Sequence, residues 1–263
     1  MKFTKMQGLG NDYLYIYGEV PENVSDLAKK YSDRHFGVGS DGLIFVSPST
    51  KADFKMRIFN ADGSEAKMCG NGIRCVGKFV YDKGYTDKTQ LTVETLSGVR
   101  SLELFVVYGK VKTVAVDMGK VSVSDDISLT AADKKFTGTP VSVGNPHFVV
   151  FVDDAENFPV EKYGQILEKN EKFKGGVNVE FAEIKDGYIR MRVWERGSGV
   201  TLACGTGASA TVAAAVKKGL AKENEYIAVR LDGGELKIKY TESGVVMTGG
   251  AEFVAEGETY DKA

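Results

Sequence analysis

Two cysteines occupy matching places in a long internal repeat. Cys69 lies in residues 56–84 and Cys204 in residues 191–219, and these two segments align without a gap. In both segments a Gly-x-Gly triplet follows the cysteine directly. Two thiols on opposite sides of one carbon atom could remove a proton from one face and return a proton to the other, which is how a stereocentre is inverted. The repeat therefore predicts a duplicated fold with one proton-transfer thiol in each half.

Each of these cysteines stands directly before a predicted helix. At a helix N-terminus, unpaired backbone N–H groups and the positive end of the macrodipole stabilise an anion, so we expect both thiols to ionise more readily than a free cysteine. The same N–H groups could hold a substrate carboxylate and stabilise the charge that develops on it. A pyridoxal phosphate route would need a Schiff-base lysine, which the sequence neither identifies nor excludes. Nothing else in the sequence indicates a cofactor.

The elements that must position the thiols are mostly strands. Short β-branched and aromatic runs with turn residues between them predict strands at 13–17, 43–46, 54–59, 102–107, 111–116, 148–152, 178–184, 188–194, 227–231, 236–240 and 245–248. Start and stop signals predict helices at 25–32, 70–83, 160–168 and 205–218. Between residues 208 and 216 the last helix contains only Ala, Val, Ser and Thr. A helix without a charged face must be enclosed by other elements.

The simplest architecture is an α+β fold of two pseudo-symmetric halves, each with mixed β-strands curled around a central α-helix. The active site would lie where the N-termini of the two central helices meet. We expect the first half to span residues 1–118, completed by the C-terminal segment 250–263, and the second half to span residues 119–249.

Composition narrows the class of partner. The chain has 263 residues and a formal net charge of -2, without a long block of like charge, so it has no electrostatic footprint for nucleic acid. A small metabolite is the expected partner. No apolar run approaches the ~18 residues of a membrane span. Three cysteines, an odd number, suit a reducing compartment better than a disulfide framework, so we expect a soluble, cytoplasmic protein.

Several sequence blocks, in order along most of the chain, resemble those of diaminopimelate epimerases. They are Gln-Gly-Leu-Gly-Asn-Asp-Tyr at 7–13, Phe-Asn-Ala-Asp-Gly-Ser-Glu at 59–65, Met-Cys-Gly-Asn-Gly-Ile-Arg-Cys at 68–75, Gly-Asn-Pro-His at 144–147, Glu-Arg-Gly-Ser-Gly at 195–199 and Ala-Cys-Gly-Thr-Gly at 203–207. The resemblance implies a pyridoxal-independent epimerase that interconverts LL- and meso-2,6-diaminopimelate, on the route to lysine and to peptidoglycan. It also implies two pseudo-symmetric halves and a homodimer.

The resemblance implies a set of site residues and no metal. The catalytic thiols fall on Cys69 and Cys204, and the direction of reaction decides which is base and which is acid. A pair that tunes thiol ionisation falls on His147 and Glu195. The substrate-binding positions fall on Asn11, Asn60, Gly70, Asn71, Asn145, Asn178, Glu195, Arg196, Gly205 and Thr206. One departure is Gly42, where many relatives carry a glutamine that contacts substrate, so we leave Gly42 out of the site.

Other interpretations remain open at this point. One alternative is that the same fold racemises another amino acid, such as histidine, or acts as a proline-racemase-like or related isomerase. A second alternative is a structural zinc site formed by the three cysteines and a histidine, although five residues separate Cys69 from Cys75, more than the usual two to four. A third alternative is a thiol switch without a catalytic role, in which Cys69 and Cys204 form a disulfide. Cys75 lies inside a predicted helix, and its repeat partner is Ala210, which favours a buried structural residue.

Overall fold

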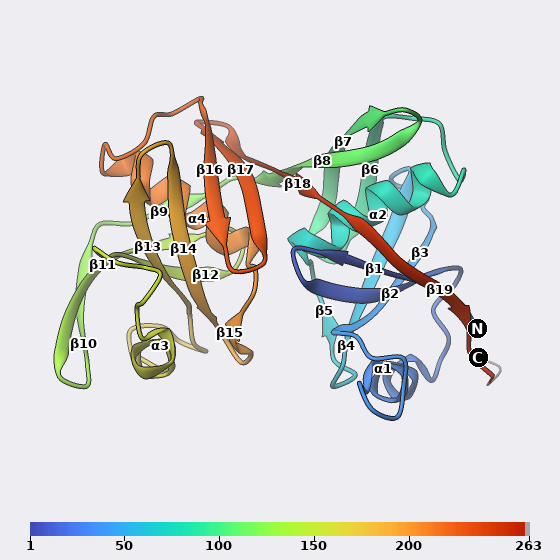
Figure 1. Ribbon diagram of the computed structural model, residues 1–263, viewed down its shortest axis with the longest axis horizontal. Coiled ribbons are helices and arrows are strands. Elements are labelled where there is room, and N and C mark those ends of the chain that lie inside the picture. Colours follow the sequence, from blue (N-terminus) through green and yellow to red (C-terminus); the bar gives the residue numbers. More distant parts are fainter. Residues whose placement is uncertain (261–263) are drawn as a thin grey trace. The chain divides into compact units, whose positions relative to one another are not determined.

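The computed structural model describes residues 1–260 and is shown in Figure 1. The described residues form four helices, α1 Val24–Ser32, α2 Gly70–Asp82, α3 Val160–Glu168 and α4 Gly205–Lys217. All four were predicted, and their ends agree to within one residue. The strands are β1 Lys2–Gly8, β2 Asn11–Tyr17, β3 Gly42–Pro48, β4 Phe54–Asn60, β5 Glu65–Ala66, β6 Gln90–Thr95, β7 Gly98–Val107, β8 Lys110–Gly119, β9 Ser122–Val123, β10 Ile127–Ala131, β11 Lys134–Ser142, β12 Pro146–Phe151, β13 Asn178–Lys185, β14 Tyr188–Glu195, β15 Gly199–Thr201, β16 Tyr226–Leu231, β17 Gly234–Thr241, β18 Gly244–Gly250 and β19 Glu252–Glu258.

The chain divides into two compact units. Unit 1 comprises Met1–Val116 together with the C-terminal segment from Gly249, and unit 2 comprises Asp117–Thr248. The C-terminal segment joins unit 1 because β19 pairs antiparallel with β1 along almost the whole of both strands. None of the helices formed by residues 1–260 is long and apolar enough to cross a membrane.

In unit 1 one mixed sheet carries a helix on each face. Its strand order is β19-β1-β2-β3-β4-β6-β7-β8, in which β2–β3 and β4–β6 are parallel and the other neighbours antiparallel. The buried helix α2 packs against β1 and β2 near one end of this order and against β7 near the other, so the sheet curls around it. The short helix α1 covers β3 and β4 on the other face, over a core of residues such as Leu14, Leu27 and Phe45.

Unit 2 repeats the part of this order that runs from β1 to β8. From β11 onward its order is β11-β12-β13-β14-β16-β17-β18, with β12–β13 and β14–β16 parallel and the others antiparallel. The enclosed helix α4 contacts β11 to β13 and β17, while α3 packs on β13 and β14 over an aromatic core that includes Phe136, Phe158 and Phe181. The α+β fold of two similar halves, each with strands curled around one helix, is confirmed, and Figure 1 shows both units.

Candidate active site

Both repeat cysteines are the N-cap residues of the enclosed helices. Cys69 precedes α2 in an extended conformation (φ −137°, ψ 115°), and its Sγ accepts a hydrogen bond from the Gly72 N–H at 3.3 Å. Cys204 precedes α4 in nearly the same conformation (φ −120°, ψ 108°), and its Sγ accepts from the Gly207 N–H at 3.4 Å. Each sulfur thus takes the place of the serine or aspartate oxygen that usually satisfies the free N–H groups of a helix start.

In unit 1, the amide of Asn11 faces the Cys69 thiol. Cys69 Sγ donates to Asn11 Oδ1 at 3.2 Å, while Asn11 Nδ2 donates to Asp41 Oδ2 at 2.7 Å. The same Asp41 oxygen accepts the Asp12 backbone N–H, and the other oxygen accepts from Arg34. Because a carboxylate accepts only, it fixes the direction of the Asn11 amide and leaves an acceptor toward the thiol. Asp41 was not among the predicted site residues.

The first turn of each enclosed helix is braced in an equivalent way. In α2 the fully buried Arg74 donates to Gly70 O at 3.2 Å and to Asn71 Oδ1 at 3.0 Å. In α4 the repeat partner of Arg74 is Ser209, whose hydroxyl donates to Gly205 O at 2.9 Å. The predicted positions Gly70, Asn71 and Gly205 therefore belong to rigid helix starts whose remaining N–H groups can face an anion.

In unit 2, a line of hydrogen bonds leads from the strands to Cys204. Asn145 Nδ2 donates to Thr206 Oγ1 at 3.2 Å, and Thr206 Oγ1 lies 3.5 Å from Cys204 Sγ. Asn145 Oδ1 lies 3.1 Å from His147 Nε2. The other ring nitrogen, His147 Nδ1, lies 2.7 Å from Glu180 Oε1 on β13. Three predicted residues, Asn145, His147 and Thr206, are thus joined to the thiol, together with Glu180, which was not predicted.

The electrostatics of Cys204 differ from the expectation. Burial, followed by the negative charges of Glu195 and Glu180, raises the pKa of the Cys204 thiol well above its usual value. The Thr206 hydroxyl and the Gly207 amide lower it by less. The prediction that the helix N-terminus would lower this pKa is therefore wrong for Cys204, because desolvation of a thiolate beside two carboxylates outweighs the helix amides.

Glu195 lies beside Cys204 at the end of β14. It accepts a hydrogen bond from the Thr201 hydroxyl and interacts with the Cys204 thiol. Burial raises the pKa of Glu195, and the charge of Glu180 adds to this rise, whereas Thr201 and Cys204 oppose it. A buried carboxyl group with a raised pKa can exchange a proton with a neighbouring thiol more easily than an exposed glutamate can.

Three further predicted site residues form hydrogen bonds with groups other than the two thiols and their neighbours. Asn178 holds the chain around Arg196, since its Oδ1 accepts the Arg196 backbone N–H at 2.9 Å and its Nδ2 donates to Pro146 O at 3.0 Å. The Arg196 guanidinium is exposed and bonds to Gly175 O at 3.2 Å. Asn60 at the end of β4 donates to Ser64 Oγ at 3.1 Å.

Gly42 has no room for a side chain. A Cβ at this position would lie 2.1 Å from the Phe59 carbonyl oxygen and 3.0 Å from the Asn60 Cα. A glutamine at position 42 would therefore need a shift of the β3 and β4 backbones where these strands pair, at Gly42 and Asn60.

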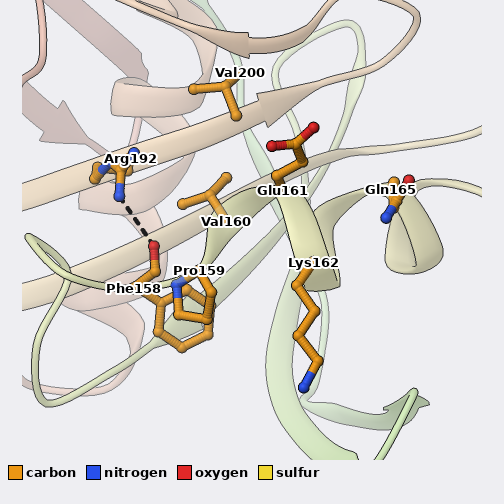
Figure 2. Close-up of a pocket in the computed structure, with 8 residues that line it drawn as sticks. All are labelled: Phe158, Pro159, Val160, Glu161, Lys162, Gln165, Arg192 and Val200. Atoms are coloured by element: carbon orange, nitrogen blue, oxygen red, sulfur yellow. Dashed lines mark hydrogen bonds between the residues drawn. The ribbon is translucent and has the colours of Figure 1, made fainter.

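A separate surface pocket of unit 2 involves none of the predicted residues. Figure 2 shows it at the start of α3, where Pro159, Val160 and Val200 line it beside Arg192. The Arg192 side chain donates to Phe158 O at 2.9 Å and pairs with Asp232, so its charge is already engaged. Within residues 1–260, no group of three or more His, Cys, Asp or Glu side chains is arranged to hold a metal ion.

Comparison with known proteins identifies the family. The family model for diaminopimelate epimerase matches residues 3–124 and 139–254. The diaminopimelate epimerase of Methanococcus maripaludis is 50% identical, over 98% of this chain and 99% of the relative, and that of Acetivibrio thermocellus is 50% identical, over 98% of each. Among solved structures, a Bacillus anthracis phenazine biosynthesis protein of the PhzF family shares the fold, with a TM-score of 0.81 at 16% identity over 99% of both chains. The chain therefore belongs to the diaminopimelate epimerase family.

Proposed function

We propose that this protein interconverts LL- and meso-2,6-diaminopimelate by proton transfer between two thiols and the α-carbon, without pyridoxal phosphate. The observation that carries the proposal is the pair of thiols, Cys69 and Cys204, each of which caps an enclosed helix at an equivalent position of a duplicated fold. Named relatives that are about half identical over nearly the whole chain support the choice of substrate.

In the proposed reaction, one sulfur is a thiolate and removes the α-proton, while the other is a thiol and donates a proton to the opposite face of the same carbon. The electron pair left by the departing proton is shared with the neighbouring carboxylate until the new C–H bond forms. Cys69 and Cys204 exchange roles when the reaction runs in reverse.

The developing negative charge needs donors that are already oriented. The N–H groups at the starts of α2 and α4, around Gly70, Asn71, Gly205 and Thr206, are such donors, because no reorganisation is needed when the charge appears. Their proposed partner is the carboxylate at the reacting carbon.

The substrate has two amino-acid ends, so the site needs groups for two carboxylates and two ammonium ions. We assign the remaining carboxylate to Arg196. Ammonium groups need acceptors, which are Glu195 and the amide oxygens of the asparagines. The proposed asparagine contacts are Asn11, Asn60, Asn145 and Asn178. His147 and Glu195 tune the ionisation of the thiols.

Three further features belong to the same proposal. The protein would act in the biosynthesis of lysine and of peptidoglycan precursors, it would work in the cytoplasm, and it would form a homodimer. Cys75 and Cys204 are free thiols, as expected in a reducing compartment. Light scattering should give about twice the 28.5 kDa of the chain, and a monomer mass at working concentration would exclude the dimer.

The test is an epimerisation assay with purified protein and no added pyridoxal phosphate. Incubation with LL-diaminopimelate under reducing conditions should produce the meso isomer, separated by chiral chromatography. Pretreatment with hydroxylamine, which traps pyridoxal phosphate, should leave the rate unchanged. If no meso isomer forms while all three thiols are reduced, the substrate assignment is wrong, and histidine is the next amino acid to test.

A further inference from the structure

Glu180 is a buried carboxylate in an otherwise apolar stretch of β13. Its side chain and that of His147 are both fully shielded from solvent, and they form an ion pair or hydrogen bond of 2.7 Å. Its second oxygen, Oε2, has no hydrogen-bond partner among the described residues. A buried carboxylate is costly unless a cation or donor offsets its charge, and the ring of His147 is the group placed to do so.

The hydrogen bonds of His147 and Asn145 have a definite donor-to-acceptor direction. His147 Nδ1 faces a carboxylate and Nε2 faces Asn145 Oδ1, so with the Asn145 amide in this direction both ring nitrogens face acceptors. An imidazole ring satisfies two acceptors only when both nitrogens carry protons. Asn145 Nδ2 then donates to Thr206 Oγ1, which leaves the Thr206 hydroxyl proton free to point at Cys204 Sγ. This direction of hydrogen bonding stabilises a Cys204 thiolate.

A second arrangement uses the same atoms. Turning the Asn145 amide by half a turn exchanges Oδ1 and Nδ2 with almost no change of shape. Nδ2 then donates to an unprotonated Nε2 of His147, and the Thr206 hydroxyl donates to Oδ1. The lone pairs of Thr206 now face Cys204, which keeps its proton as a thiol. Both arrangements hold the same number of protons, since His147 has gained one proton in the first and Cys204 has kept one in the second.

We propose that Glu180 is a positioning residue that couples the protonation of His147, through Asn145 and Thr206, to the direction of the hydrogen bond at Cys204. The inference rests on the proposed function, because a two-thiol epimerase needs Cys204 as a thiolate in one direction of reaction and as a thiol in the other. Glu180 stabilises the imidazolium and thereby favours the arrangement that accompanies the thiolate.

The corresponding amide in unit 1 lacks a histidine partner among its hydrogen bonds described above. In unit 1 the corresponding amide, Asn11, donates to Asp41, whose charge is held by Arg34, so its direction is fixed. In unit 2 the place of that fixed carboxylate is taken by the ring of His147, whose Nε2 can either donate or accept a hydrogen bond. Cys204 needs such compensation, because burial and the charges of Glu195 and Glu180 disfavour its thiolate.

The direct and the relayed effects of Glu180 have opposite signs. Acting on Cys204 only as a nearby negative charge, Glu180 raises the pKa of the thiol, so its removal would favour the thiolate. Acting through His147, Glu180 supports the imidazolium, so its removal would favour the thiol. The sign of the change at Cys204 therefore distinguishes the relay from simple proximity. Glu195 faces the same thiol and remains unchanged in the test.

The experiment replaces Glu180 by Gln, which keeps the size and the acceptor for His147 Nδ1 but removes the charge. The variant is made in full-length protein carrying Cys69→Ser and Cys75→Ser, so that ultraviolet thiolate absorbance reports Cys204 alone. We expect the thiolate fraction at a fixed pH below the midpoint to fall about tenfold, which is one unit of pKa. We also expect the ¹⁵N signals of the His147 ring to lose the doubly protonated form.

Glu183→Gln is the matched control, because Glu183 is a second buried carboxylate of β13 that binds Ala155 N and Lys185 instead of His147. It should leave both readouts unchanged. An equal or larger thiolate fraction in Glu180→Gln would overturn the relay. Both readouts are independent of turnover, so a wild-type protein that fails to epimerise diaminopimelate would refute the proposed function without deciding this test.

Discussion

Cys69 and Cys204 are equivalent helix N-cap residues, but the charged and polar groups around their thiols differ. Beside Cys69 lie an amide oxygen of fixed direction and, one turn into the helix, the buried cation Arg74. Beside Cys204 lie two carboxyl groups, Glu195 and Glu180, and a histidine. A duplicated backbone therefore holds two sulfurs that have different charged and polar neighbours.

Serine at either position tests the role of the thiols. Cys69→Ser and Cys204→Ser should each lower kcat by about a thousandfold, because a hydroxyl is a far weaker acid than a thiol and general acid–base catalysis of this kind contributes ~10²–10⁴-fold. Initial rates of meso-isomer formation measure the loss, and circular dichroism checks that the fold is intact.

Cys75→Ser is the matched control for the serine variants. Cys75 is fully buried inside α2, where burial raises the pKa of its thiol to about 11, and the proposed reaction gives it no role. Its variant should keep most of the wild-type rate. Retention of more than a tenth of the rate in either of the other two variants would contradict the two-thiol mechanism.

At the residue scale, the repeat was enough to find both thiols, because a cysteine directly before a helix start is a local pattern. Glu180 and Asp41 were missed for a different reason. Each contacts a predicted site residue that is distant in the sequence, His147 for Glu180 and Asn11 for Asp41. The sequence does offer one signal for Glu180. It is a charged residue within an apolar strand, and a charge buried there needs a hydrogen-bonding or ionic partner.

The helices were more predictable than the strands. Caps and all-round apolar composition identified α2 and α4, and ten residues of α4 are buried. Four longer strands, β1, β6, β11 and β19, were missed because Lys, Thr, Glu and Gly interrupt their apolar pattern. In β11, Gly138 packs where a Cβ would lie 2.6 Å from Val149 O, a constraint that only the tertiary structure reveals. The C-terminal segment was expected to complete the first half, but no local pattern predicted strand β19 or its pairing with β1.

The first turn of α4 depends on a glycine. A Cβ at Gly207 would lie 2.7 Å from Glu180 Oε1 and 3.2 Å from Cys204 Sγ. Since Glu180 is tied to His147 and cannot move freely, Gly207→Ala should destabilise the protein by about 1–3 kcal/mol in urea unfolding, the usual cost of overpacking.

Its repeat partner provides the comparison. A Cβ at Gly72 would meet the flexible ends of Ile44 and Met56, at 2.8 and 3.2 Å, and these can move aside. Gly72→Ala should therefore cost less than Gly207→Ala. An equal cost at both positions would show that the buried Glu180–His147 pair adds no rigidity.

At the scale of the whole molecule, the two units share one strand order and one helix position, and each contributes one thiol. Residues 1 and 259 both lie in unit 1, where the Met1 ammonium donates to Thr259 Oγ1 at 2.9 Å. The proposed reaction uses one thiol from each unit. The proposed reaction is therefore a property of the duplicated chain.

The most direct test of the two-thiol account is the fate of solvent deuterium in the first few per cent of conversion. With LL-diaminopimelate in deuterium oxide, the account predicts deuterium at the inverted carbon of the meso product and protium in the recovered substrate, because the removed proton and the incoming deuteron reside on different sulfurs. Deuterium entering the recovered LL isomer as fast as the product, or protium retained at the inverted carbon, would mean that a single base serves both faces and would contradict the account.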